Sequence, residues 1–368
     1  MSLAYSPEHD DLRSAVRKLL AEQGDSEHLR RTLESDEPFD RDLWKTMAQE
    51  LGLHGMALPE EYGGSGFGFL EQAVVLEEMG RAVHASPYLA SVVMAATLIR
   101  LSGNDEACAE HLPGIASGDV VATAAVLDGN GTWAGVKTGL ALDSSGRVSG
   151  VAPFVIDGAV ADLLLAVVNA GREQVLVAVR TAQDGVQTQN HPTMDQTRGL
   201  ATVTLSEVDA SVIARGDAVV TALAETELHV LAALSAEMVG GAGKVLEVTV
   251  DYAKIREQFG VPIGSFQAIK FKAADMLLDL EAARSASLYA SRAVAEEAAD
   301  SGFAAEVAKA VCSEAYFAIS AQSIQIFGGI GFTWEHDAHL HFKRAKSSEV
   351  LLGNSDVHRE RIATRQGW

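Results

Sequence analysis

The stretch that decides the fold is Ala233–Gln267, which reads ALSAEMVGGAGKVLEVTVDYAKIREQFGVPIGSFQ. Its apolar residues recur at three-, four- and seven-residue spacing: Leu234, Met238, Val245, Val248 and Tyr252. This spacing predicts a long helix with one buried face. Each glycine inside a helix costs about 1 kcal/mol relative to alanine. The small-residue run Gly240–Gly243 therefore predicts that another helix or a flat ligand comes close to the helix here.

The end of this helix carries residues suited to a phosphate and a flat ring. Gly260 and Pro262 predict that the helix stops near Phe259. Arg256 and Gln258 come just before that point. A guanidinium binds phosphate oxygens in pairs, and an aromatic ring packs on another flat ring. A surface arginine beside a core phenylalanine is the commoner alternative for such residues.

Composition excludes several classes of function. The chain has 368 residues, with 29 basic and 50 acidic side chains and a net charge of −21. This charge argues against binding to nucleic acid or to an anionic membrane surface. Two cysteines, Cys108 and Cys312, form neither a disulfide framework nor a metal motif, so we expect a cytoplasmic location. The polar N-terminus lacks the features of a signal peptide, and no apolar run of about 18 residues predicts a membrane span.

The pattern along the chain changes twice. Pro7–Glu110 is mostly helical in pattern, with Ser6 as a helix cap before Pro7 and a further amphipathic helix over Phe39–Leu53. Gly118–Val212 contains short alternating segments separated by turn residues, as in a compact β domain. From Gly216 onward the helical pattern returns.

These changes predict an α+β fold that is mostly α-helical. We expect an N-terminal helical domain over residues 1–117, a middle β domain over residues 118–214, and a C-terminal helical bundle over residues 215–368.

The common nucleotide, metal and triad motifs are not present. Neither a P-loop nor a G-x-G-x-x-G motif follows a strand, and no G-x-S-x-G motif or recognisable catalytic triad occurs. His336, His339 and His341 lack a further ligand at a suitable spacing, so we expect no metal site. Gln325–Phe332, by contrast, is a helix end followed by glycines, which leaves backbone groups open to a ligand. An ordinary helix C-terminus explains it equally well.

Three motifs in this order resemble those of the acyl-CoA dehydrogenase family. They are Glu60–Gly64 (EEYGG), Arg256–Gly260 (REQFG) followed by Phe266-Gln267, and Gln325–Phe332 (QIFGGIGF). The resemblance covers essentially the whole chain. It implies a four-helix N-terminal domain, a β-barrel-like middle domain, a C-terminal four-helix bundle, FAD, and a tetramer built as a dimer of dimers. It also implies an acyl-CoA substrate and electron-transfer flavoprotein or a similar electron acceptor.

The resemblance further implies which residues hold the cofactor. Arg256 would pair with the FAD pyrophosphate of a neighbouring subunit, and Phe259 would pack on the same cofactor. Gln325 and Gly329 match the positions that contact its adenosine side. The full set of cofactor-binding candidates is Arg256, Gln258, Phe259, Gln267, Gln325, Gly328 and Gly329.

The chain departs from the family pattern at the flavin and the base. Where the family carries T-E-P-x-x-G-S-D, this chain has Ala124–Trp133 (AAVLDGNGTW), and its W-[IS]-[TS]-N segment reads Phe154–Asp157. In the family's Y-E-G-T run, the glutamate is the catalytic base. The alignment places Leu352 at that glutamate and Asn354 at the threonine, and a leucine cannot accept a proton.

Another carboxylate could replace this base. Some family members carry the base on the long helix, and an ungapped match places Val230 near that position. Glu237 lies in an apolar run nearby, and Glu227 precedes it on the same helix. A partly desolvated carboxylate is a stronger base near neutral pH, which favours Glu237 as the catalytic residue. Glu227 is the second candidate. Alternatively, Glu237 is a structural acid that pairs with an arginine or a helix end.

The retained and missing motifs together predict a divided enzyme. The chain keeps the segments that reach a neighbour's FAD and lacks much of what binds its own flavin and substrate. We therefore predict one subunit of a heteromeric acyl-CoA dehydrogenase, with a sister subunit in an α₂β₂ tetramer. Such divided enzymes in this family act on steroid-derived CoA thioesters, which suggests that substrate class. A self-sufficient homotetramer with Glu237 or Glu227 as base, and a non-catalytic scaffold, are the alternatives.

Overall fold

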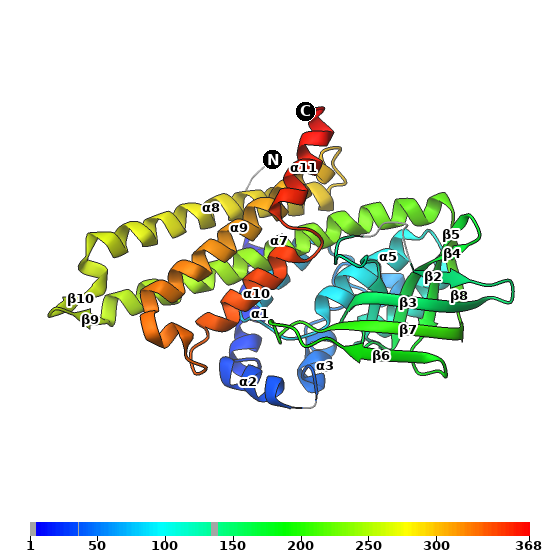
Figure 1. The fold of residues 1–368 in the computed structure, drawn as a ribbon, viewed down its shortest axis with the longest axis horizontal. Helices are drawn as coiled ribbons and strands as arrows, with labels where there is room; N and C mark the ends of the chain where they lie inside the picture. The colour runs from blue at the N-terminus through cyan, green and yellow to red at the C-terminus, as the bar shows by residue number, and fades with distance from the viewer. Residues whose placement is uncertain (1–4, 36, 134–138) are drawn as a thin grey trace. The chain divides into compact units, whose positions relative to one another are not determined.

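The computed structural model describes residues 5–35, 37–133 and 139–368. Helices come first, then a sheet, then helices again (Figure 1), so the predicted α+β class and element order are confirmed. The first helices are α1 (Pro7–Gln23), α2 (Ser26–Glu34), α3 (Arg41–Gln49), the 3₁₀ turn η1 (Glu60–Tyr62), α4 (Phe69–Arg81), the π-helical η2 (Leu89–Ala95), α5 (Ala96–Leu101) and α6 (Asp105–Ala116).

Side-chain caps set where the early helices begin. Ser6 and His9 form a capping box at the start of α1, as the sequence predicted for Ser6. The Asp40 carboxylate accepts hydrogen bonds from the backbone N–H groups of Asp42 and Leu43, which fixes the start of α3. The predicted helix over Phe39–Leu53 is therefore shorter at both ends than expected.

A mixed sheet forms the middle of the chain. Among the described residues its strand order is β6-β7-β3-β2-β4-β5-β8, and β1 pairs with β4 in parallel. The apolar run of β4 is buried on both faces, which explains why it does not alternate. The strands are β1 (Ala122–Ala125), β2 (Leu140–Leu142), β3 (Arg147–Ile156), β4 (Leu163–Ala170), β5 (Glu173–Arg180), β6 (Val186–Asn190), β7 (Leu200–Asp209) and β8 (Ser211–Arg215).

Long helices make up the C-terminal part. Helix α9 packs against α8, α10 and α11. The elements are α7 (Asp217–Ile255), β9 (Glu257–Gln258), β10 (Val261–Pro262), η3 (Ile263–Ser265), α8 (Gln267–Ala295), α9 (Ser301–Phe327), η4 (Gly328–Phe332), α10 (Ala338–Val350) and α11 (Ser355–Gln366). Helix α7 is long and apolar enough to cross a membrane by length and composition alone, but 56% of its most apolar window is buried in the structure. A helix that packs inside the core of a globular protein shows the same length, composition and burial.

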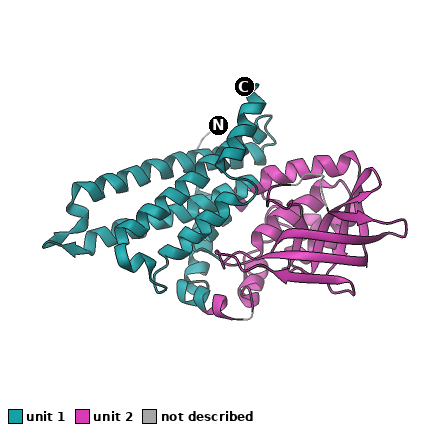
Figure 2. Ribbon diagram, in the orientation of Figure 1, with its two compact units in different colours: residues 1–30, 73–84, 231–368 teal, residues 31–72, 85–230 magenta. Residues whose placement is uncertain are grey.

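The chain folds as two compact units (Figure 2). One comprises residues 1–30, 73–84 and 231–368, and the other comprises residues 31–72 and 85–230. The sheet belongs to the second unit, and the helices α8 to α11 belong to the first. The division into three domains at residues 117 and 214 stays a prediction.

The glycine run of α7 is a helix-crossing point within the first unit. A Cβ atom on Gly240 would lie 1.7 Å from the carbonyl oxygen of Glu77 in α4. Conversely, a Cβ atom on Gly80 of α4 would lie 1.9 Å from the carbonyl oxygen of Glu237. The two backbones can approach this closely only because both positions lack a side chain. Of the two predicted neighbours, a helix or a flat ligand, the structure places a helix here.

Candidate functional site

The segment that carries Arg256 and Phe259 is a tight hairpin rather than a helix end. Helix α7 ends at Ile255, earlier than the sequence predicted. β9 and β10 then pair in antiparallel fashion, with Phe259 and Gly260 as the two loop residues. Both have positive φ, 54° and 77°, as a two-residue type I′ turn requires. Gly260 therefore serves the hairpin turn rather than capping the helix.

The hairpin presents its side chains to solvent. Phe259 is 93% exposed, and Arg256 and Gln258 are exposed too. The backbone of Arg256 is fixed, because its N–H donates to Tyr252 and its carbonyl accepts from Ile263. Within the described ranges its guanidinium makes no ion pair or hydrogen bond. Phe259 is thus not a core residue, which removes the commoner structural interpretation for that ring.

The other cofactor candidates lie on two neighbouring segments. Gln267 is the exposed first residue of α8. The residue before it, Phe266, places its ring 6.2 Å from the ring of Phe259, edge to face. These contacts bring Arg256, Gln258, Phe259 and Gln267 together around one hairpin.

The glycines after α9 form the second segment. Gln325 is exposed on the last turn of α9, and Gly328 has φ 64° and ψ −137°, a conformation open essentially to glycine alone. A Cβ atom on Gly328 or Gly329 would meet nothing within 4 Å, so this face of the backbone is open. The ring of Tyr252 packs on that of Phe327 at 4.7 Å, which joins this segment to the hairpin.

Large apolar side chains are exposed on these same segments. A folded chain that works alone rarely leaves so many in one region, so such a surface marks a place where a partner or ligand binds. The exposed fractions are Ile255 77%, Phe271 60%, Ile330 47%, Phe332 78% and Trp334 49%.

The candidate base Glu237 is buried in an ion pair. Its side chain is 6% exposed, and Nη1 of Arg344 in α10 donates to its Oε1 at 2.7 Å. Nη2 of Arg344 donates to the carbonyl oxygen of His84 at 3.2 Å, which fixes the guanidinium from a second side. This is the structural pairing that the sequence left open. The second candidate, Glu227, is half-buried nearer the start of α7. Catalysis by either residue stays a prediction.

The turn that holds Leu352 is firmly fixed. Leu352 is fully buried with φ 64°, and Gly353 follows with φ 105°. The fully buried Lys309 donates from Nζ to the carbonyl oxygens of Glu349 and Gly353 at 3.0 and 2.9 Å. Nε2 of His358 lies 3.1 Å from the same Gly353 oxygen. The match to the family pattern placed Leu352 at the position of the catalytic glutamate. It did not show that two buried basic side chains, Lys309 and His358, hold the turn around it.

The sequence did contain one signal for this turn. Lys309 is the only basic residue in the otherwise apolar run Ala308–Cys312, and a lysine inside an apolar helix is buried only when its ammonium finds acceptors.

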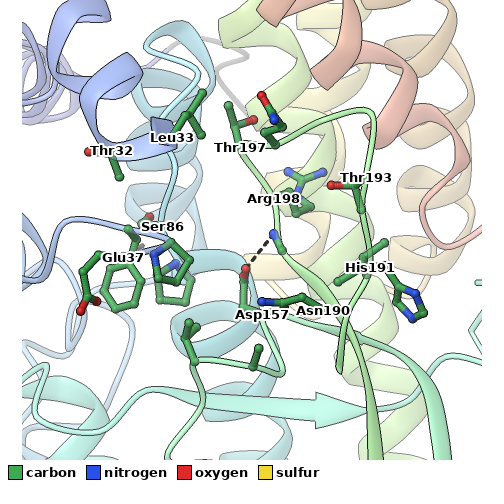
Figure 3. A pocket seen from close by; sticks show the side chains of 18 of the residues that line it. Thr32, Leu33, Glu37, Ser86, Asp157, Asn190, His191, Thr193, Thr197 and Arg198 are labelled. Atoms are coloured by element: carbon green, nitrogen blue, oxygen red, sulfur yellow. Dashed lines mark hydrogen bonds between the residues drawn. The ribbon is translucent and has the colours of Figure 1, made fainter. Parts of the chain in front are cut away.

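The second unit contains a polar pocket that the sequence did not reveal (Figure 3). Its volume is about 300 Å³, and its walls come from four loops. Asp157, at φ 53°, accepts a hydrogen bond from the backbone N–H of Gly199 at 3.1 Å. His191 lies 3.0 Å from the carbonyl oxygen of Pro153, next to the Phe154–Asp157 segment. Polar residues in its lining include Ser86, Asp157, Asn190, His191, Thr193, Thr197 and Arg198.

The three histidines of the C-terminal part have other contacts. In the described ranges, no group of three or more His, Cys, Asp or Glu side chains could hold a metal ion. The His336 ring packs on Phe327, His339 stacks on Trp334, and His341 contacts the hydroxyl of Tyr316.

Two family models and a curated relative match most of this chain. The family models described as acyl-CoA dehydrogenase, N-terminal domain and acyl-CoA dehydrogenase, C-terminal domain match residues 6–119 and 222–367. The chain is 34% identical to acyl-CoA dehydrogenase IpdE2 of Mycolicibacterium smegmatis over 350 residues, covering 95% of both chains.

Two solved structures are similar over nearly the whole chain. One is the ChsE4-ChsE5 complex from Mycobacterium tuberculosis, with 27% identity, a TM-score of 0.90, and coverage of 100% of this chain and 99% of that one. The other is the steroid ACAD Tcur3481-Tcur3483 (G363A variant), with 30% identity, a TM-score of 0.87 and coverage of 98% of each chain.

Proposed function

Because the chain belongs to the acyl-CoA dehydrogenase family of oxidoreductases, we propose that it is one subunit of an FAD-dependent dehydrogenase. The enzyme would introduce an α,β double bond into an acyl-CoA thioester. The observation that carries this proposal is the hairpin, which exposes Arg256 and Phe259 instead of burying them. This subunit would contribute that hairpin to the FAD site of a partner subunit.

The residues of the hairpin suit FAD. An exposed guanidinium without an ion pair in the described residues can bind a pyrophosphate, and an exposed phenyl ring can pack on a flat cofactor. The open backbone at Gly328 and Gly329 allows close approach of the adenosine side, with the exposed Gln325 on the preceding turn of α9 as an amide donor. Gln258 and Gln267 supply further exposed amides at the hairpin. Bound FAD would accept the β-hydrogen as hydride while a carboxylate removes the α-proton.

Three observations favour a divided enzyme over a self-sufficient one. Leu352 occupies the position of the family's base and is buried in a fixed turn. Glu237 is already paired with Arg344. One similar structure is named as the ChsE4-ChsE5 complex, and the name of the other joins two proteins, Tcur3481-Tcur3483. We therefore place a sister acyl-CoA dehydrogenase subunit beside this chain in an α₂β₂ tetramer.

The substrate class and cellular setting follow as parts of the same proposal. One similar structure is named a steroid ACAD, which supports a steroid-derived CoA thioester as the substrate. Electron-transfer flavoprotein or a similar carrier would reoxidise the flavin. Two buried, unpaired cysteines and the burial of α7 are consistent with a cytoplasmic enzyme.

Arg256→Gln tests the proposed cofactor contact. A hydrogen-bonded charge contributes about 1.5–3 kcal/mol, so the variant should bind FAD about 10- to 100-fold more weakly in the assembled protein. The measurement is flavin absorbance per tetramer during titration of the apoprotein with FAD. Lys254→Gln is the matched control, because Lys254 is an exposed cation on the same helix end that pairs with Asp251. Equal FAD affinity in Arg256→Gln, Lys254→Gln and the parent protein would remove Arg256 from the site.

Purification of the chain alone separates the divided enzyme from its alternatives. A yellow homotetramer with one FAD per subunit that reduces an acceptor on addition of acyl-CoA would support a helix-borne base instead. A sister subunit that stays fully active after this chain is removed would support the scaffold role. The divided enzyme predicts activity only when both chains are present.

A further inference from the structure

A cavity of about 580 Å³ lies within the first unit, between α1, α4, α7 and the start of α10. This volume is in the range of small-molecule sites. None of the residues that line it is one of the cofactor candidates or the candidate bases. Its apolar wall is formed by Leu20, Leu29, Val83, Val245, Val248 and Leu340.

Most of the charges at the wall of this cavity are paired, including Asp337 with Arg30, and the carboxylates of Asp25 and Glu335 are exposed to solvent. Nη2 of Arg17 lies 2.7 Å from the carboxylate of the buried Glu78. Arg81 and Lys244 both pair with the carboxylate of Glu247, and Nζ of Lys244 lies 3.1 Å from it. An anionic ligand would compete with these carboxylates, and a cationic ligand would compete with the basic side chains. The cavity is therefore suited to an uncharged molecule.

Three buried polar side chains line this space: Glu78 and Ser323 are hydrogen-bonded to Arg17 and Thr249, and His341 is the third. His341 is 5% exposed and lines the cavity, with Nδ1 at 2.9 Å from the hydroxyl of Tyr316. Burial lowers the pKa of His341 to about 3, so the ring is neutral at physiological pH. In the described ranges, its Nε2 has no hydrogen-bond partner. A ligand hydroxyl can pair with Nε2 in either tautomer of the ring, because a hydroxyl both donates and accepts.

Tyr316 is itself held in place, which fixes the ring of His341. A Cβ atom on Gly241 of α7 would lie 2.5 Å from the Tyr316 ring, so the tyrosine packs directly on the helix backbone. The Tyr316 side chain is 1% exposed. The direction of the free Nε2 is thus set by packing before any ligand arrives.

A strained residue at the end of α4 completes the wall. Val83 has φ 48° and is 3% exposed. The N–H of Val83 donates to the carbonyl oxygen of Gly80, and the N–H of His84 donates to that of Met79. These two bonds end the helix, and the left-handed position that Val83 takes is usually occupied by glycine. A β-branched residue in this conformation is an outlier. Such strain persists where the surroundings require the side chain, and here the side chain faces the cavity.

We propose that this cavity binds an uncharged, mainly apolar molecule that carries a hydroxyl group, with the hydroxyl bonded to Nε2 of His341. The apolar wall holds the hydrocarbon part, and the paired charges at the wall exclude ionised analogues. The site is separate from the proposed flavin site, so it adds a second ligand to this subunit.

The probe for this site is nonan-1-ol, titrated into the assembled protein by calorimetry. Nonanoate and nonylammonium have the same chain and opposite charges, and each should bind at least about tenfold more weakly. His341→Phe keeps an aromatic ring but removes the hydrogen bond, so it should weaken nonan-1-ol about tenfold. Equal affinity for the alcohol and both ions, or no effect of His341→Phe, would overturn the proposal.

A blocking variant tests the location of the bound alcohol. Val248→Phe puts a phenyl ring into the cavity and should abolish binding. Val220→Phe adds the same ring to an exposed position of α7 and should leave binding unchanged. If Val248→Phe does not fold, the ¹⁵N shift of His341 Nε2 in the parent protein replaces it. An unchanged shift at saturating nonan-1-ol would exclude the site. FAD content and turnover do not enter either readout, so a failure here is distinct from a failure of the proposed function.

Discussion

Gly240→Ala is expected to destabilise the protein by about 3 kcal/mol or more. The new methyl carbon would lie 1.7 Å from the carbonyl oxygen of Glu77. The atom it meets belongs to a helix backbone, so no side chain can rotate away, and α4 and α7 have to separate. Separation also opens the packing around the crossing, which adds to the cost. The measurement is the free energy of unfolding of the assembled protein in denaturant.

Gly243→Ala is the matched control on the same helix. A Cβ atom at Gly243 would meet only Nη2 of Arg284, at 3.3 Å, which is the end of a flexible side chain. Helix propensity then dominates, and the variant should be more stable by up to about 1 kcal/mol. Gly80→Ala should behave like Gly240→Ala, because its methyl would lie 1.9 Å from the carbonyl oxygen of Glu237. Similar stabilities for Gly240→Ala and Gly243→Ala would contradict the close crossing.

This crossing also marks how far the sequence could predict the fold. The cost of three glycines in a helix pointed to a close neighbour at Gly240–Gly243. The sequence could not identify that neighbour, because the matching Gly80 lies far away in the chain and inside an ordinary amphipathic pattern. Hydrophobic periodicity specifies which face of a helix is buried, but it does not specify the partner.

The hairpin at Phe259 was mistaken for a helix terminus for a related reason. Gly260 and Pro262 are typical of a helix end, and glycine with positive φ caps helices as well as it completes type I′ turns. Only the pairing of Glu257–Gln258 with Val261–Pro262 distinguishes the two. The residue types at the candidate site were predictable, whereas the exposure of Phe259 depended on this backbone geometry.

Buried charges were the least predictable part of the site. Helix α10 contains several basic residues, including Lys343, Arg344 and Lys346, in a polar pattern. Of these three, only Arg344 is buried, because it alone meets Glu237 and the carbonyl of His84. A pattern of residue types cannot show which member of such a run turns inward, since that depends on the position of α7.

Arg344→Met is expected to destabilise the protein by about 3–5 kcal/mol, because it leaves the carboxylate of Glu237 buried without its partner. Arg359→Met is the control, since Arg359 and Glu314 form a pair of similar length, 2.6 Å, that is about half exposed. Removal of that surface pair should cost no more than about 1 kcal/mol. The measurement is again the free energy of unfolding in denaturant. Equal losses in the two variants would show that burial of the Glu237 pair does not matter.

The double variant Glu237→Met/Arg344→Met then separates a structural from a catalytic role for Glu237. Replacing both members of a buried pair by apolar residues of similar size is often nearly neutral, so the double variant should recover most of the stability lost in Arg344→Met. If Glu237 serves only the packing of α7 against α10, the double variant in the assembled enzyme should retain the turnover number of the parent. If Glu237 is the base, turnover should fall by about 100-fold or more despite restored stability, because a methionine cannot accept the α-proton. Stability and kcat measured on the same preparation distinguish the two roles, and a turnover loss of that size would move the base from the sister subunit to this chain.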